Sequence, residues 1–399
     1  MAQGQESGIR SDRVEFVRES TVGVVPDDPS WNKFSDVVKT LDWTPDAQIE
    51  AQRGLGSADP YGHNSANESH EVTVGYDLQQ QIASGKDPLY DGMARTSGDL
   101  LPNTHSIVER NVRPKSDVSG ADATRTYTVV KGAYIGTATL SGEAGSAQPL
   151  NGELSYTAEK VRSYQVHQPG TAETLAVKST DSSDTTQSLI IESEGASTSD
   201  TVDLNGTTEA TTIVTFDDID ALELSAETLG DVHVSIQNGA TLATIFGKNT
   251  YGGREGDLGI PALGGGSHPT DIGSSYEFYQ ATSSERPSGT DPAYRVSAVE
   301  LSVDNSVDTT GRSDSVRQEI SVGPRTISLT ATVMGPNETH DQIMDHLKAT
   351  KNDYIWTLSN TTLTVGKATL VDSGNRERGP EQSFYEFDSG FEGESLSFS

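Results

Sequence analysis

The chain has 399 residues, of which 59 are acidic and 28 basic, so its formal net charge is −31, and it contains no cysteine. Disulfide bonds and thiolate metal sites are therefore excluded. Sequence-specific binding to nucleic acid is not expected, because affinity for a phosphate backbone comes from clustered Lys and Arg, and the sequence has no such cluster. The excess of carboxylates indicates a halophilic origin, since concentrated salt screens their mutual repulsion. The alternative interpretation is an ordinary acidic surface.

The N-terminal residues give no sign of export. Residues 1–15 lack the apolar core of a signal peptide, and no apolar run approaches the length that crosses a bilayer. We therefore expect synthesis and assembly in the cytoplasm, without membrane insertion.

An extended arm is predicted at residues 18–68. Its prolines fix an extended course and forbid helix. Its large apolar side chains have no apolar partner nearby in the sequence, and a monomer rarely leaves such groups exposed. Either the segment folds back on its own domain or a neighbouring subunit covers it. The candidate contact residues are Val24, Pro26, Pro29, Trp31, Phe34 and Trp43.

After the arm, alternating apolar and polar residues at 71–78 predict a strand. The segment from Thr171 to Thr250 then holds 14 acidic and 2 basic residues, and is more than twice as negative per residue as the rest of the chain. It has its own strand patterns, and a glycine-rich stretch follows at 252–269. We predict a separable small β-domain inserted at 166–268, with a flexible exit loop, between two parts of one outer domain at 1–165 and 269–399.

Strands return after the insert. Alternation at 298–305, 316–322 and 326–333 predicts three strands, and residues 355–372 are predicted to form a hairpin. One helix is predicted between them, because Thr339 and Gln342 form a capping box ahead of apolar residues on one helical face. The fold class is therefore all-β with one flanking helix.

The search for catalytic motifs is negative. The sequence has no phosphate-binding loop, nucleophile elbow or dinucleotide fingerprint. His340 and His346 lack the spacing of helical metal ligands, and the acidic run at 217–220 lacks the glycine and terminal glutamate of a calcium loop. We predict no catalytic residues, no metal and no cofactor, and hence no enzyme.

Two motifs resemble the signatures of tail tube proteins of long-tailed viruses. The first is Glu19, followed by Gly23 and Pro26 in a Gly-x-x-Pro pattern and then by an aromatic residue, Trp31. In the second, a strand ends in Asp304 and Asn305, a polar loop follows, and a Gly-x-Arg turn at 323–325 leads into a long strand. The resemblance covers roughly residues 10–160 and 290–399. The acidic middle departs from it, and looks like the extra domains that some of these proteins carry outside the tube.

The resemblance implies a β-sandwich whose inner sheet joins with those of five further copies into a hexameric barrel. Rings of this kind stack into a tube that conducts DNA without specific binding. The implied partners are further copies of the chain and the tail terminator, baseplate and tape-measure proteins, and the implied location is the virion tail. The water-facing residues of the predicted inner strands become lumen candidates: Glu71, Thr73, Asp77, Glu300, Ser302, Glu319, Thr326, Ser328 and Thr330.

Two other functions stay open on the sequence. An acidic β-sandwich could be a surface or adhesion protein of a halophile, although no signal peptide or anchor supports this. An all-β glycosidase is the weaker alternative, because abundant Asp and Glu residues carry almost no information in so acidic a chain.

Overall fold

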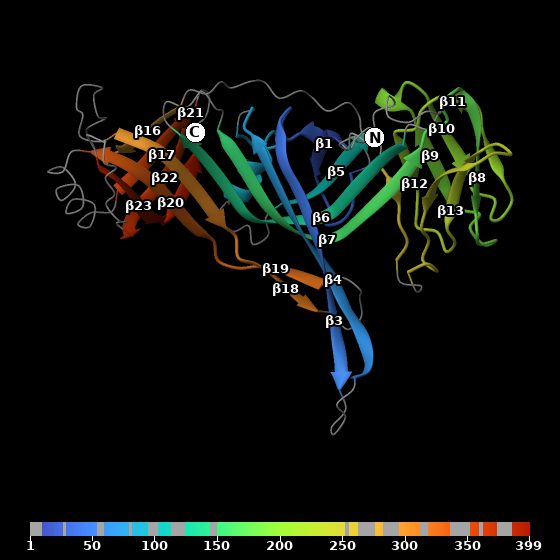
Figure 1. Ribbon diagram of the computed structural model, residues 1–399, viewed down its shortest axis with the longest axis horizontal. Helices are drawn as coiled ribbons and strands as arrows, with labels where there is room; N and C mark the ends of the chain where they lie inside the picture. The colour runs from blue at the N-terminus through green and yellow to red at the C-terminus, as the bar shows by residue number, and fades with distance from the viewer. Residues whose placement is uncertain are drawn as a thin grey trace, which may run out of the picture.

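The computed structural model describes residues 10–26, 29–53, 60–79, 82–94, 103–112, 124–143, 150–251, 255–261, 276–281, 295–311, 318–335, 352–358, 362–372 and 385–399 (Figure 1). Strands dominate these residues, which confirms the all-β class. The helix predicted from Thr339 lies outside the described residues. A short helix that was not predicted, α1 (Pro88–Met93), begins with Asp87 as its N-cap, whose carboxylate accepts a hydrogen bond of 2.9 Å from the Leu89 amide.

The largest sheet has fourteen strands. Its members are β1 (Arg10–Arg18), β2 (Asn32–Lys33), β3 (Val38–Arg53), β4 (Pro60–Asp77), β5 (Thr104–Val112), β6 (Thr124–Glu143), β7 (Asn151–His167), β16 (Tyr276–Ala281), β17 (Arg295–Asp304), β20 (Thr326–Gly335), β21 (Asn352–Leu358), β22 (Thr362–Asp372), β23 (Tyr385–Gly393) and β24 (Ser395–Phe398). Strands β21 and β22 pair as the predicted hairpin. The described strands of this single chain do not form a closed barrel.

The long strands β6 and β7 form the centre of this sheet. On one edge, β6 pairs with β7 along almost its whole length. On the other edge, its first half pairs with β5 and its second half with β17. The sheet therefore divides at β6 into an N-terminal branch through β5, β1 and β2, and a C-terminal branch through β17, β20 and β23. Both branches enclose one apolar core, which includes Phe16, Tyr76, Ile135, Leu301 and Leu329.

The insert is a separate sandwich of two four-stranded sheets. One sheet has the order β10-β9-β12-β15 and the other the order β11-β8-β13-β14. The strands are β8 (Glu173–Ser179), β9 (Ser188–Glu192), β10 (Ser199–Asp203), β11 (Ala210–Phe216), β12 (Ala221–Leu224), β13 (Val232–Ile236), β14 (Thr241–Ile245) and β15 (Gly259–Ile260), with a 3₁₀ turn, η2 (Glu194–Ala196), after β9.

The insert shares its core with the large sheet instead of hanging from loops alone. A second apolar cluster joins insert residues such as Leu189 and Val234 to Val108, Tyr127 and Val166 of the large sheet. The face of β5–β7 that looks away from the main core thus packs against the insert. Figure 1 shows the insert at one end of the long axis and the C-terminal strands at the other.

Two hairpins leave the sheet on the same side. Strands β3 and β4 pair over their full lengths, and their far ends project well beyond the body (Figure 1). Strands β18 (Val307–Gly311) and β19 (Gln318–Val322) form a separate two-stranded sheet near the base of that projection.

Candidate functional site

One face of the large sheet is polar across six neighbouring strands: β4, β7, β6, β17, β20 and β23. Residues in register form rows that run across these strands. One row contains Gly75, Glu153, Thr139, Ser302, Ser328 and Glu392, the next contains Asp77, Asn151, Ser141, Glu300, Thr330 and Gly390, and a third contains Thr73, Ser155, Thr137, Asp304 and Thr326. None of these positions holds Lys or Arg. The residues that alternate with them along each strand, such as Val74, Leu154 and Val303, are buried in the main core.

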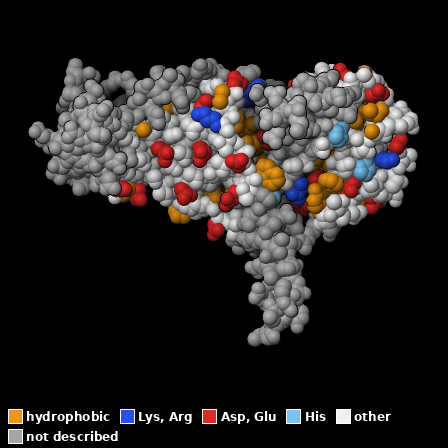
Figure 2. All heavy atoms as spheres, viewed as in Figure 1, with side chains coloured by type: hydrophobic (Ala, Val, Ile, Leu, Met, Phe, Trp, Pro, Cys, Tyr) orange, Lys and Arg blue, Asp and Glu red, His pale blue; other side chains and the backbone are white. Residues whose placement is uncertain are grey.

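The side chains of the rows are acidic, amide or hydroxylic. Glu300, Ser328 and Thr330 are exposed, and the Thr139 hydroxyl donates a hydrogen bond of 3.2 Å to the Ser302 hydroxyl, which links β6 to β17. In Figure 2, separate acidic side chains are spread over the broad sheet face turned toward the viewer. Such a surface repels phosphate, and the positions of its three rows offer phosphate no cationic contact.

Seven of the nine lumen candidates lie on this face with exposed or half-exposed side chains. They are Glu71, Thr73, Glu300, Ser302, Thr326, Ser328 and Thr330. Asp77 lies in the second row but is buried, and Lys39 of β3 forms an ion pair with its carboxylate. Lys39 also donates a hydrogen bond of 3.4 Å to Asn151, so this cation sits at the margin of the face with its charge neutralised.

Glu319 was wrongly assigned to the inner sheet. It lies in β19, which among the described strands pairs with β18 and not with the large sheet. Alternation along β19 predicts a strand correctly, but a strand's period carries no information about which sheet it joins. Conversely, Glu153, Ser155 and Thr157 of β7 were missed, although their alternation with Leu154 and Tyr156 was available as a signal.

The arm prediction is wrong for two aromatic residues. Phe34 is fully buried in its own chain, where its ring lies 4.8 Å from that of Phe16 and 5.5 Å from that of Tyr76, centroid to centroid. Trp31 is 3% exposed and belongs to the cluster shared with the insert. Both side chains pack against residues that are distant in sequence, and the local sequence pattern could not show these contacts.

The remaining arm residues are at least partly accessible. Pro26 and Pro29 are half-buried on the body of the domain, and Val24 is exposed beside the turn that joins it to Thr21. Trp43 is 41% exposed in β3, where it pairs with Val72. The first part of the predicted arm therefore folds back on the chain, and the β3–β4 hairpin is the part that projects.

The first sequence motif is a buried anchor. The Glu19 carboxylate accepts hydrogen bonds from the Gly23 amide (2.8 Å), the Ser106 hydroxyl (2.6 Å) and the Gly132 amide (2.9 Å). Gly132 has a φ of 61°, a conformation that favours glycine. Glu19 thus ties the arm to β5 and β6, and its spacing to Gly23 is explained by the turn it caps.

The second motif holds the end of α1. The Asn305 side-chain amide donates to the carbonyls of Gly92 and Ile135, each at 3.1 Å, and the Arg325 guanidinium donates to the Met93 carbonyl at 2.6 Å. The carbonyls of Gly92 and Met93 are among those that the C-terminus of a helix leaves unpaired, and the Ile135 carbonyl ties this end of the helix to β6. Both motifs accordingly make contacts that hold the fold together.

A buried polar network lies beside α1. The Asp91 carboxylate contacts Arg18 and lies 3.0 Å from Nε2 of His105, which is itself fully buried. Burial by itself raises the pKa of Asp91, but the hydrogen bonds from His105 and Arg18 outweigh this effect, so the pKa of the carboxyl lies below its ordinary value.

Two buried carboxylates fix the insert to the large sheet. Asp220 accepts hydrogen bonds from Arg110 (2.8 Å) and the Tyr127 hydroxyl (2.7 Å), and Arg125 lies 3.4 Å away. Burial and the neighbouring Asp220 charge raise the pKa of Tyr127, so that this phenol stays protonated as a donor.

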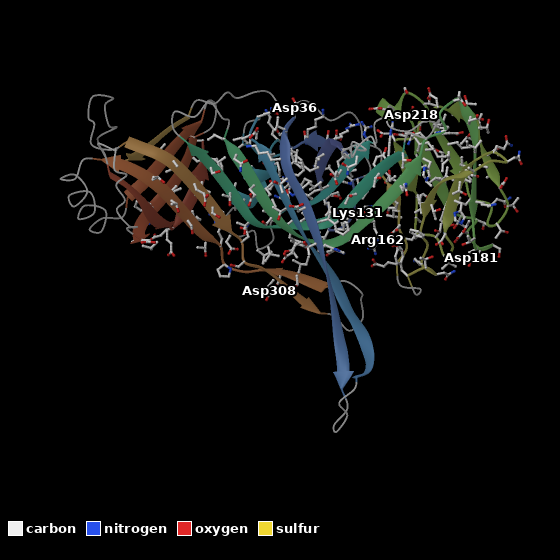
Figure 3. All side chains as sticks on the ribbon, in the orientation of Figure 1. Asp36, Lys131, Arg162, Asp181, Asp218 and Asp308 are labelled. Carbon is white, nitrogen blue, oxygen red and sulfur yellow. The ribbon has the colours of Figure 1, made fainter. Side chains whose placement is uncertain are left out.

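Asp257 forms the second of these contacts. Arg162 donates to it at 3.0 Å and the Tyr251 hydroxyl at 2.8 Å, while the Lys160 ammonium lies 3.4 Å away. Figure 3 shows Lys131 and Arg162 where β6 and β7 meet the insert. Burial lowers the pKa of both Lys131 and Lys160. The scaffold thus directs several of its few cations toward the acidic insert.

Within the described ranges, no group of three or more His, Asp or Glu side chains could hold a metal ion. No helix in the same ranges is long and apolar enough to cross a membrane. The chain matches no model of a known protein family, and a search of curated proteins also finds no match.

Proposed function

We propose that the protein is a structural virion protein, the subunit of a hexameric tail tube of a long-tailed virus with a halophilic host. The observation that carries this proposal is the polar face of six strands, on which no row position holds Lys or Arg. Turned toward the lumen of a tube, this face would let DNA slide without forming phosphate contacts.

The outline of the subunit supports assembly. Strand β3 pairs only with β4, so among the described strands its other edge is available to a further chain. An unpaired edge of this length is a liability for a monomer, and a closed ring of subunits removes it. In the proposed tube the projecting β3–β4 hairpin would bridge successive rings, and the half-exposed Trp43 at its base would offer an apolar contact. The tail terminator, baseplate and tape-measure proteins would be the further partners, and the virion tail its location.

The test is electron microscopy of the purified chain, followed by DNA binding. We expect rings and stacked tubes with a central channel, and tubes that do not retain double-stranded DNA. In Glu300→Lys, each ring gains a set of cations in the channel, so tubes should still form but bind DNA about tenfold more tightly or better.

Asp203→Lys is the matched control, because it makes the same charge change at an exposed position of the insert. It should leave DNA retention near the wild-type level. Equal retention by both variants would remove the lumen assignment. Discrete monomers at every salt concentration would contradict the tube and favour the surface or adhesion protein.

A further inference from the structure

We draw no further inference here: the strongest candidate, the exposed apolar surface patch at Ile213 and Val214 in strand β11 of the insert, carries nothing because no feature of the described residues shows what covers it.

Discussion

At the scale of single residues, the most informative side chains are the few carboxylates that are buried and not exposed to solvent. Glu19, Asp91, Asp220 and Asp257 are each at most 7% exposed, whereas most of the other carboxylates in the described ranges are at least partly exposed. Each accepts hydrogen bonds from partners far away in sequence. Removing one partner of a buried charge of this kind costs about 3–5 kcal/mol, because the remaining charge loses its compensation.

Asp91 gives a prediction about pH. Its pKa is lower in the folded chain than the ordinary value of 3.8, so the folded state favours the ionised carboxylate. Its contribution to the free energy of unfolding is complete above pH 3.8 and is lost as the pH falls through the folded pKa. Asp91→Asn should therefore be less stable than wild type at neutral pH, and should lose less stability on acidification below pH 4.

Urea unfolding of both proteins between pH 7 and pH 2.5 measures the effect. Asp36→Asn is the matched control, because Asp36 is exposed. If the free energies of unfolding of wild type and Asp91→Asn changed in parallel with pH, the lowered pKa of Asp91 in the folded chain would be contradicted.

At the scale of elements, the joint between the insert and strands β5–β7 differs most from expectation. It has an apolar part, with Val108, Tyr127 and Val166, and a charged part around Asp220 and Asp257. Deletion of the insert would therefore expose an apolar surface and leave cations without their partners.

We expect that replacing residues 171–260 with a short Gly/Ser linker yields a chain that aggregates or melts at lower temperature than wild type. The same deletion with Val108, Val129 and Val166 replaced by Thr should recover solubility, because the newly exposed strand positions then carry hydroxyls. Thermal melting and light scattering compare the two. If the deletion without the three Thr substitutions melted at the wild-type temperature, the contact between the insert and β5–β7 would contribute nothing to stability.

The sequence predicted correctly which residues share one face of a strand, but it did not predict which strands pair with one another. Val299, Leu301 and Val303 alternate with Glu300 and Ser302, so the polar face could be predicted from period alone. The sheet to which Glu319 belongs and the partners of Trp31 depend on contacts across the chain, which no local period encodes. Helix α1 has only six residues, too few for a recognisable pattern.

At the scale of the whole molecule, the net charge of −31 acts against compactness. Salt screens repulsion between exposed carboxylates over a distance that shrinks from about 10 Å at 0.1 M to about 3 Å at 1 M, whereas buried ion pairs are screened much less. Salt should therefore reduce the repulsion between exposed carboxylates, while the buried ion pairs of Asp220 and Asp257 that hold the insert are weakened much less.

The melting temperature should accordingly rise between 0.1 M and 2 M KCl, by about 1 °C for each ~1 kcal/mol that screening adds to the free energy of unfolding of a chain this large. Calorimetry at constant pH measures it, and glucose at matched viscosity controls for solvent effects other than screening. A melting temperature that falls with KCl would argue against the halophilic host.

The divided edge of β6 has a consequence for synthesis. Its first half is covered by β5, which precedes it, but its second half waits for β17, which begins at Arg295 after the whole insert. A ribosome must therefore extend the chain through the insert while that edge lies open, at a rate of about 5–20 residues per second. During those seconds the edge can capture the wrong strand, its own or that of another nascent chain. The insert, whose strands all lie between β7 and β16, can fold within this interval.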